Sequence, residues 1–336
     1  MAEIVCLIIG IFLIIVIFRD ILFTTYSMEG GGELTDFFLK HSWFGLLWLC
    51  GGDGRKKLLN YAGMFMMISL IVLWSLGLWL GVFLLFASDP SAIVHSDTLQ
   101  HTDLWEKAYF SGYVLTTMGL GDYMPINAYW GILSAVFSFF GLLFITLMVS
   151  YAVPVLSNVI TKKQLSLFVQ QHGDSPAALI DYLWNGKDFS RLEQFRQQLQ
   201  QSILTIAQSY RAYPILHYFH TNKQNESLIV TLCMLDETLA IMQQYISPEQ
   251  WEEKELLPLQ KAIDHYLNTM RDTYGYAEDE STEIPSLDLQ MLSKMGIRWN
   301  NNSNFDWQRK QLWSRLLNSK GWTWKEVYPT QQAKVA

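Results

Sequence analysis

Three long runs without charge constrain this chain more than any other feature. They cover residues 4–18, 61–87 and 128–160, and each is almost free of charged side chains. About 20 helical residues cross the hydrocarbon core of a bilayer, so the second and third runs are long enough to span it. The first run is short, but Ile21–Phe23 can extend it beyond the Arg19–Asp20 pair. The sequence therefore predicts an all-α membrane protein.

The first run has an alternative interpretation as a cleaved signal peptide. Signal peptides carry positive charge before the apolar run and an A-x-A cleavage site after it. No Lys or Arg precedes this run and no such site follows it. We therefore expect residues 1–26 to hold an uncleaved transmembrane helix.

Basic residues predict the orientation in the membrane, because they concentrate in cytoplasmic loops. Arg55, Lys56 and Lys57 precede the second span, and Lys162 and Lys163 follow the third. The loop between these spans is mainly acidic. In a cell membrane, we expect the N-terminus and residues 88–127 to lie outside, and residues 27–60 and 161–336 to lie in the cytoplasm.

The second half of the outward loop has the pattern of a half-helix. Residues 103–116 read DLWEKAYFSGYVLT, and Asp103 with Glu106 three residues later forms a capping-box pattern. The segment then becomes apolar and aromatic, yet it is too short to span a bilayer. Non-helical backbone at membrane depth is tolerated only inside protein or against water. We expect a re-entrant half-helix at 103–116, followed by such backbone at 117–121.

The two glycines in this backbone have a physical reason. A strand that points successive carbonyls at one axis needs left-handed or otherwise unusual dihedral angles at alternate residues, and glycine adopts them without a Cβ penalty. The carbonyls of Thr117, Met118, Gly119 and Leu120 can then replace the water shell of a cation, with Gly121 completing the strand. We expect the Met118 and Leu120 side chains to turn back into the protein. The Thr117 hydroxyl adds an oxygen at the inner end.

Asp122 follows directly, at the outer mouth, where carboxylates concentrate cations.

The order span, half-helix, TTMGLGD, span resembles the pore module of the tetrameric potassium channels, whose usual loop reads TTVGYGD. The resemblance covers residues 61–163. It implies passive K⁺ conduction, K⁺ bound by backbone carbonyls, no other cofactor and, with one loop per chain, a homotetramer in membrane lipid. The implied parts are an outer helix at 61–87, a pore helix at 103–116, a filter at 117–121 and an inner helix at 128–160.

The loop departs from the usual pattern at several positions. Leu120 stands in place of the usual Tyr, and Met118 in place of Val or Ile. That Tyr is normally tied by its hydroxyl to an aromatic cuff on the pore helix, so Leu120 leads us to expect bracing by packing alone. Leu120 also keeps a weakly selective cation channel open as an alternative. The residues expected to support the filter are Thr116, Tyr109, Phe110 and Tyr113.

Two residues of the inner helix are candidate gating hinges. Gly141 lies in the middle of the third run, and Pro154 lies near its cytoplasmic end. The alternative is that Gly141 only allows close packing between helices. No span carries Arg or Lys at three-residue spacing, so a voltage sensor is not expected. Residues 35–49 are typical of an interfacial helix, with Thr35 or Asp36 as its cap.

Residues 164–336 have the pattern of a helical cytoplasmic domain. No G-x-G-x-x-G after a strand, no P-loop and no convincing nucleophile–base or metal constellation is present, so the sequence does not predict an enzyme. The net charge of −7 gives no sign of nucleic-acid binding. A membrane sensor with a non-conducting, pore-like anchor stays open as a second class. The expected helices cover 175–185, 189–210, 224–245, 248–273 and 306–319, with a linker at 277–283.

Overall fold

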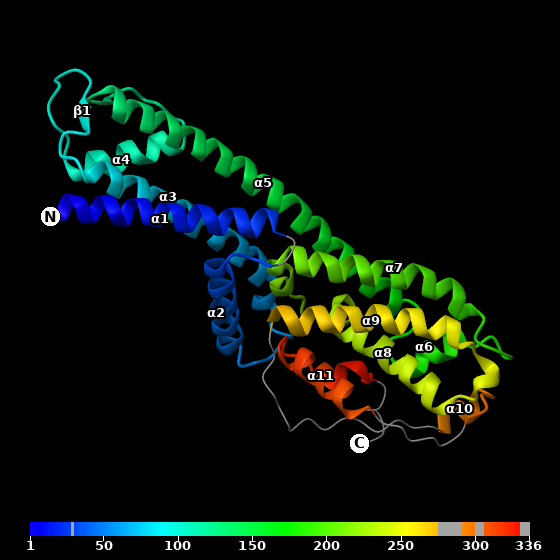
Figure 1. The fold of residues 1–336 in the computed structure, drawn as a ribbon. Helices are drawn as coiled ribbons and strands as arrows, with labels where there is room; N and C mark the ends of the chain where they lie inside the picture. Colours follow the sequence, from blue (N-terminus) through cyan, green and yellow to red (C-terminus); the bar gives the residue numbers. More distant parts are fainter. Residues whose placement is uncertain (28–29, 275–289, 300–305, 330–336) are drawn as a thin grey trace. The chain divides into compact units, whose positions relative to one another are not determined.

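The computed structural model describes residues 1–336 except 28–29, 275–289, 300–305 and 330–336. It is mainly helical and contains almost no sheet, as the sequence predicts. Among the described residues, three helices are long and apolar enough to cross a membrane. They are α1 (Ala2–Tyr26), α3 (Ala62–Ala87) and α5 (Ala128–Gln170) (Figure 1).

The chain divides into two compact units. Residues 1–39 and 65–155 form the first, here called the membrane unit. Residues 40–64 and 156–336 form the second, here called the cytoplasmic unit after its predicted location. Both α3 and α5 contribute residues to each unit, and so does α2 (Glu33–Leu49).

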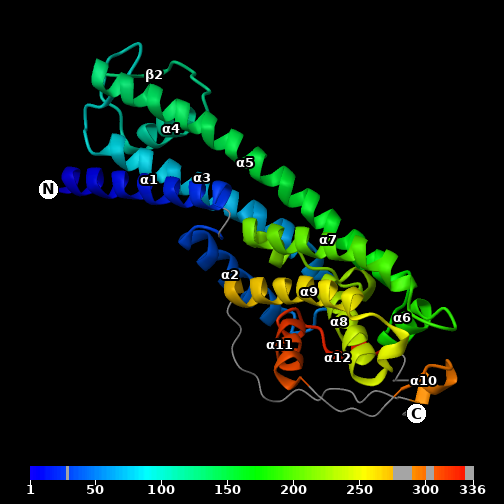
Figure 2. The same cartoon turned by 45° about the vertical axis from the view of Figure 1, so that its right-hand side comes forward.

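In the membrane unit, α1 packs against α3 through glycines. A Cβ added at Gly10 would lie 2.9 Å from the carbonyl oxygen of Gly81, so the two backbones approach closely. Both views show the helices side by side (Figures 1 and 2). The Phe18 ring of α1 also stacks on Phe140 of α5, with ring centroids 5.2 Å apart. The first helix is thus part of the membrane unit and does not stand alone.

Asp20 near the end of α1 fixes the start of α2. Its carboxylate accepts hydrogen bonds from the backbone N–H groups of Leu34 and Thr35, at 3.0 and 3.2 Å, and from the Trp74 indole at 2.8 Å. The expected cap at Thr35 or Asp36 is wrong, because α2 begins earlier, at Glu33. A residue of the preceding helix supplies the acceptor instead.

The connection between α3 and α5 contains a short hairpin and α4 (Leu104–Leu115). Strands β1 (Ile93–His95) and β2 (Tyr123–Pro125) pair antiparallel, with His95 opposite Tyr123. In both views α4 lies between α3 and α5 (Figures 1 and 2). Its Phe110 and Tyr113 join Phe86 of α3 and Phe137 of α5 in a buried core.

The inner helix is longer than predicted. It was expected to end at residue 160, but α5 continues to Gln170. The added turns bury Leu165 and Val169 in the cytoplasmic unit, which gives them a packing reason to stay helical. Pro154 lies inside α5, and the helix continues on both sides of it.

The cytoplasmic unit is a bundle around α8, whose side chains are buried along most of its length. Two further long helices, α7 and α9, run side by side (Figures 1 and 2). The α-helices here are α6 (Pro176–Leu183), α7 (Arg191–Ala212), α8 (Leu228–Tyr245), α9 (Glu253–Tyr274), α10 (Gln290–Lys294), α11 (Trp307–Asn318) and α12 (Trp324–Val327). Short 3₁₀ segments are η1 (Lys57–Tyr61), η2 (Pro214–Tyr218), η3 (Gln224–Glu226) and η4 (Pro248–Gln250).

Several expected helix starts in this unit are wrong. The helix expected from 224 begins at Leu228, after η3, and the helix expected from 248 begins at Glu253, after η4. Trp307 is exposed and does not join the buried face of Trp313 on α11. Helices α10 and α12 are too short to give a periodic pattern and were not predicted. The predicted linker at 277–283 lies outside the described residues.

Candidate functional site

The half-helix before the filter sequence is capped as its sequence predicts. Asp103 accepts a hydrogen bond from the Glu106 backbone N–H at 2.8 Å, and Glu106 accepts one from the Asp103 N–H, also at 2.8 Å. The helix ends at Leu115, and the N–H and hydroxyl of its C-cap residue, Thr116, both donate to the Gly112 carbonyl. The carboxyl end of a helix carries partial negative charge, which favours a cation nearby.

The backbone after α4 alternates between left-handed and ordinary dihedral angles. Thr117, Gly119 and Gly121 have φ values of 59°, 56° and 84°. The expected alternation is therefore present, and it includes a threonine, for which positive φ is uncommon. The Met118 N–H donates to the Tyr113 carbonyl at 3.0 Å and fixes the start of this strand on α4.

The carbonyl oxygens of residues 117–120 accept no hydrogen bond from any part of the chain that the structure describes. Residues 116–122 are all exposed in the single chain, and Asp122 follows at their outer end. These oxygens are therefore open to a ligand from outside the chain. Backbone carbonyls suit hard cations such as K⁺.

Hydrogen bonds brace the outer end of this strand. The Ser96 hydroxyl donates to the Gly121 carbonyl at 2.6 Å, and the Ser96 N–H donates to the Asp122 carbonyl at 3.0 Å. The Tyr113 hydroxyl donates to the Tyr123 carbonyl at 2.7 Å. The expectation of bracing by packing alone is therefore wrong: these polar contacts come from α4 and the hairpin and need no hydroxyl at Leu120.

Aromatic rings add a second layer of support. Tyr109 meets Tyr113 and Tyr123 edge to face, with centroids 5.5 and 5.8 Å apart, and Phe110 meets Tyr113 at 4.9 Å. The Tyr123 hydroxyl donates to Glu106, which also pairs with His95 at 3.0 Å. Tyr109, Phe110 and Tyr113 thus lie on α4 and pack against one another or against Tyr123, and their role in supporting a filter stays a prediction.

Sequence reasoning missed three members of this network: Ser96, His95 and Tyr123. No local pattern marks them, because the strands that carry or flank them have only three residues each. These residues come together because β1 pairs with β2 across the loop, and a single sequence does not reveal such pairing.

Met118 and Leu120 do not turn back into the chain that carries them. Their side chains are 56% and 55% exposed, since no element in the described part of the chain covers this side of the strand. A cavity of about 300 Å³ lies on the other side, lined by the strand, by α4 and by small residues of α5 that include Ser134 and Ser138.

Gly141 has a packing reason to be glycine. A Cβ at this position would collide with the carbonyl oxygen of Leu115, at the end of α4. The close-packing alternative is therefore supported at Gly141. The hinge roles of Gly141 and Pro154 stay predictions.

A short half-helix and a strand of open carbonyls thus lie between two helices that are long and apolar enough to cross a membrane. Residues 69–158 match a protein family described as "Ion channel". The chain is 30% identical over 281 residues to "Uncharacterized membrane protein YdjJ" of Bacillus subtilis (strain 168), and the match covers 83% of this chain and 81% of YdjJ. No solved structure matches. The chain therefore belongs to the same membrane-protein family as YdjJ and carries an ion channel domain.

Proposed function

We propose that the protein is a potassium-selective channel that conducts K⁺ passively through a homotetrameric pore. The observation that carries the proposal is the strand 117–121, with positive φ at alternate residues and unbonded carbonyls at 117–120. In this proposal the carbonyls of Thr117, Met118, Gly119 and Leu120 bind K⁺. Asp122 concentrates cations at the outer mouth.

The exposed side chains next to the filter support assembly from several copies. One chain supplies only one loop, whereas a ring of carbonyls needs several around an axis. Met118 and Leu120 are exposed, and an open cavity lies behind the same strand. Neighbouring copies would cover these groups. Four copies would make the pore that the TTMGLGD resemblance implies.

The bracing of the strand favours strict selectivity over weak selectivity. Leu120 removes the usual tyrosine hydroxyl, which is the reason to consider a weakly selective cation channel. Tyr113 and Ser96 supply hydrogen bonds to the segment 121–123 instead. A braced strand keeps the carbonyl spacing fixed, and that spacing is one of the terms that separate K⁺ from Na⁺.

The positive-inside rule supports an orientation for this pore in a cell membrane. The half-helix and the hairpin then face outward with the N-terminus. Residues 27–60 and 161–336 then face the cytoplasm. The cytoplasmic ends of the outer and inner helices carry the basic clusters that set this orientation.

K⁺ efflux from liposomes tests the proposal. The purified full-length protein is reconstituted in K⁺-loaded vesicles, and efflux is followed with and without barium, which blocks potassium filters. We expect a K⁺ flux that barium abolishes. No flux above that of empty vesicles would instead support the class of a membrane sensor with a non-conducting pore-like anchor.

A further inference from the structure

A cavity in the membrane unit lies where α3, α4 and α5 meet. Its volume is about 300 Å³. Its lining residues lie within 75–79 of α3, 112–116 of α4 and 141–145 of α5, and all of them belong to the membrane unit. Among the described residues, none lines both this cavity and the one beside Ser134 and Ser138. It is therefore a separate space, at the end of α4 from which the strand 117–121 starts.

Apolar side chains form most of this lining. Among the described residues that form it, only Ser75, Trp79 and Thr116 carry a polar group in the side chain. Each already donates a hydrogen bond to a backbone carbonyl oxygen, at 2.8 Å for Ser75 and at 2.9 Å for Trp79 and for Thr116. A water molecule inside a protein needs about two to four polar partners. The cavity therefore does not favour water, and no side-chain donor remains for a polar ligand.

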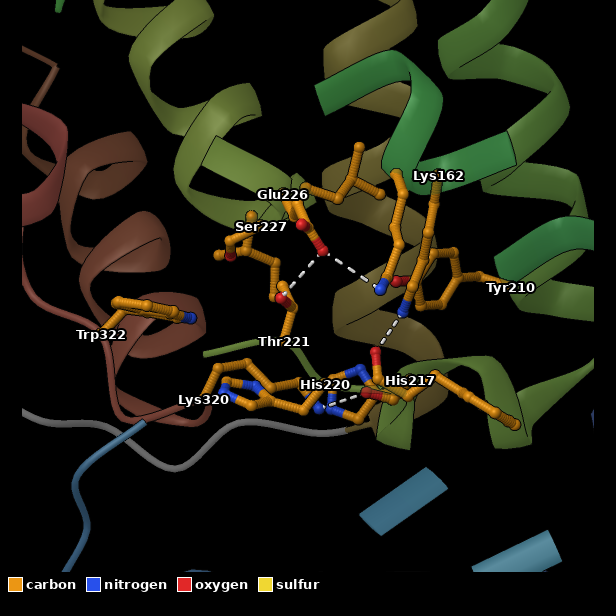
Figure 3. Close-up of a pocket in the computed structure, with 13 residues that line it drawn as sticks. Lys162, Tyr210, His217, His220, Thr221, Glu226, Ser227, Lys320 and Trp322 are labelled. Carbon is orange, nitrogen blue, oxygen red and sulfur yellow. Dashed lines mark hydrogen bonds and ion pairs between the residues drawn. The ribbon is translucent and has the colours of Figure 1, made fainter. Parts of the chain in front are cut away.

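A cavity of the cytoplasmic unit, shown in Figure 3, has a different lining. Its volume is about 30 Å³, and the side chains of Lys162, Lys320 and Glu226 line it. Its polar lining and its size suit a single water molecule. The cavity of the membrane unit is larger and apolar, and these two properties suit hydrocarbon instead.

The cavity of the membrane unit lies at the depth of the hydrocarbon core of a bilayer. Residues 75–79 lie near the middle of α3, one of the helices that are long and apolar enough to cross a membrane. About 20 helical residues cross the hydrocarbon core, so the middle of such a helix is far from both headgroup regions. No bulk water is present at this depth. The medium next to the cavity is therefore lipid hydrocarbon.

A row of exposed apolar side chains leads along α3 to the cavity. Ile68, Val72 and Leu76 are spaced four residues apart and are each about half exposed, and Leu76 lines the cavity. Residues at this spacing lie on the same face of a helix. On α5, Ile145 also lines the cavity and is 50% exposed. The row therefore gives a lipid acyl chain a continuous apolar path from the first turns of α3 to the cavity.

We propose that this cavity binds the end of a phospholipid acyl chain from the leaflet next to the first turns of α3. An empty apolar cavity leaves its lining atoms without dispersion partners on one side. An apolar cavity of about 150 Å³ stays dry and binds benzene, so a cavity of this size has room for a chain end. The bound chain contacts Leu115 and Thr116, the last residues before the strand 117–121.

Photo-crosslinking of the full-length protein in vesicles tests this site. The vesicles are made of phosphatidylcholine, part of which carries a diazirine at the end of one acyl chain. After illumination, mass spectrometry locates the labelled residues. We expect label on residues 112–116 of α4 as well as on the lipid-facing residue Ile68. Ser75→Phe places a ring in the cavity, and we expect it to lower the label on 112–116 at least fivefold while the label on Ile68 stays unchanged.

Ile15→Phe is the matched control, because it places the same ring on an exposed side chain of α1 that does not line the cavity. It should be labelled like wild type. If Ser75→Phe does not fold, the wild-type label decides alone. Wild-type label confined to lipid-facing residues such as Ile68 would overturn the proposal, as it would if a second copy of the chain covers the cavity. So would equal label on 112–116 in Ser75→Phe and wild type. The labelling requires no ion flux, so its outcome is independent of the proposed K⁺ conduction.

Discussion

Two stretches of backbone outside the α-helices present carbonyl oxygens in opposite ways. In the strand 117–121 they are exposed, and no donor of the described chain binds those of residues 117–120. In the segment 214–220 the carbonyls of Leu216, His217 and Phe219 are bonded by the tethered ammoniums of Lys162 and Lys320. In segment 214–220 the chain supplies its own cations, so the carbonyls there have a structural role. In the strand 117–121 the described chain supplies no cation, so the carbonyls of residues 117–120 remain available to an ion from solution.

The largest expected effect comes from removing the dihedral freedom of the exposed strand. Gly121 has a φ of 84°, and a Cβ there would meet no atom within 4 Å. Gly121→Ala therefore acts through backbone strain, which costs roughly 1–2 kcal/mol per residue, and not through a clash. We expect K⁺ flux from liposomes to fall to the background of empty vesicles, with membrane insertion unchanged.

Gly131→Ala is the control for this substitution. Gly131 also has open space around it, but it lies in the helix α5 and has no positive φ. We expect its flux to match wild type. Normal flux from Gly121→Ala would refute the dihedral argument.

The second prediction concerns the partly buried cation Arg309 of the cytoplasmic unit, which we expect to act structurally. Arg309 pairs with Asp236 at 2.6 Å and also with Asp264. Arg309→Met leaves Asp236 buried without its cation, so we expect the free energy of unfolding to fall by about 3–5 kcal/mol. Denaturant unfolding measures it. The K⁺/Na⁺ permeability ratio of the folded fraction should not change, and a changed ratio would contradict the separation of roles.

Arg298→Met provides the comparison for Arg309. Arg298 pairs with Glu249 at 3.1 Å, but both side chains are largely exposed. Exposed pairs of this kind contribute about 0–1 kcal/mol. Equal losses of unfolding free energy in Arg309→Met and Arg298→Met would contradict the expectation that the more buried ion pair contributes more to stability.

The third prediction concerns pH. Burial lowers the pKa of His220 from 6.5 to about 4, against a smaller opposing effect of its hydrogen bond to the Gly54 carbonyl. Below pH 6.5, the His220 imidazole binds a proton in the unfolded chain but stays neutral in the folded chain. The cytoplasmic unit should therefore lose stability as the pH falls from 6.5 towards 4, by about 3 kcal/mol at full effect.

Thermal unfolding across this pH range checks the assignment. His220→Asn should flatten the slope without abolishing it, since burial also lowers the pKa of His217. His101→Asn, at an exposed site, should keep the wild-type slope. An unchanged slope in His220→Asn would show that other groups govern this response.

The smallest effect is expected from loosening the brace of the strand. Tyr113→Phe removes the 2.7 Å hydrogen bond to the Tyr123 carbonyl, worth about 1 kcal/mol. We expect conduction to persist and the K⁺/Na⁺ permeability ratio to fall severalfold, as measured by reversal potentials. Tyr129→Phe, which changes an exposed tyrosine, should leave the ratio unchanged. Equal ratios in both variants would mean that packing alone braces the strand.

The features that could be predicted from the sequence are those that depend on a local pattern of residues. The capping box of α4, the three long helices and the glycine alternation each depend on residues a few positions apart. The bracing by Ser96 could not be predicted, because Ser96 lies 25 residues before Gly121 and no periodic pattern links them. The cavity lined by Lys162 and Lys320 could not be predicted for the same reason, because its lining residues come from segments far apart in the sequence.

The proposed selectivity is tested most directly by the reversal potential of the wild-type protein in a planar bilayer, with K⁺ on one side and Na⁺ on the other. If the carbonyls of residues 117–120 form a braced potassium filter, the current should reverse far towards the K⁺ equilibrium potential. A reversal potential near zero would contradict it, because the two ions would then pass equally well.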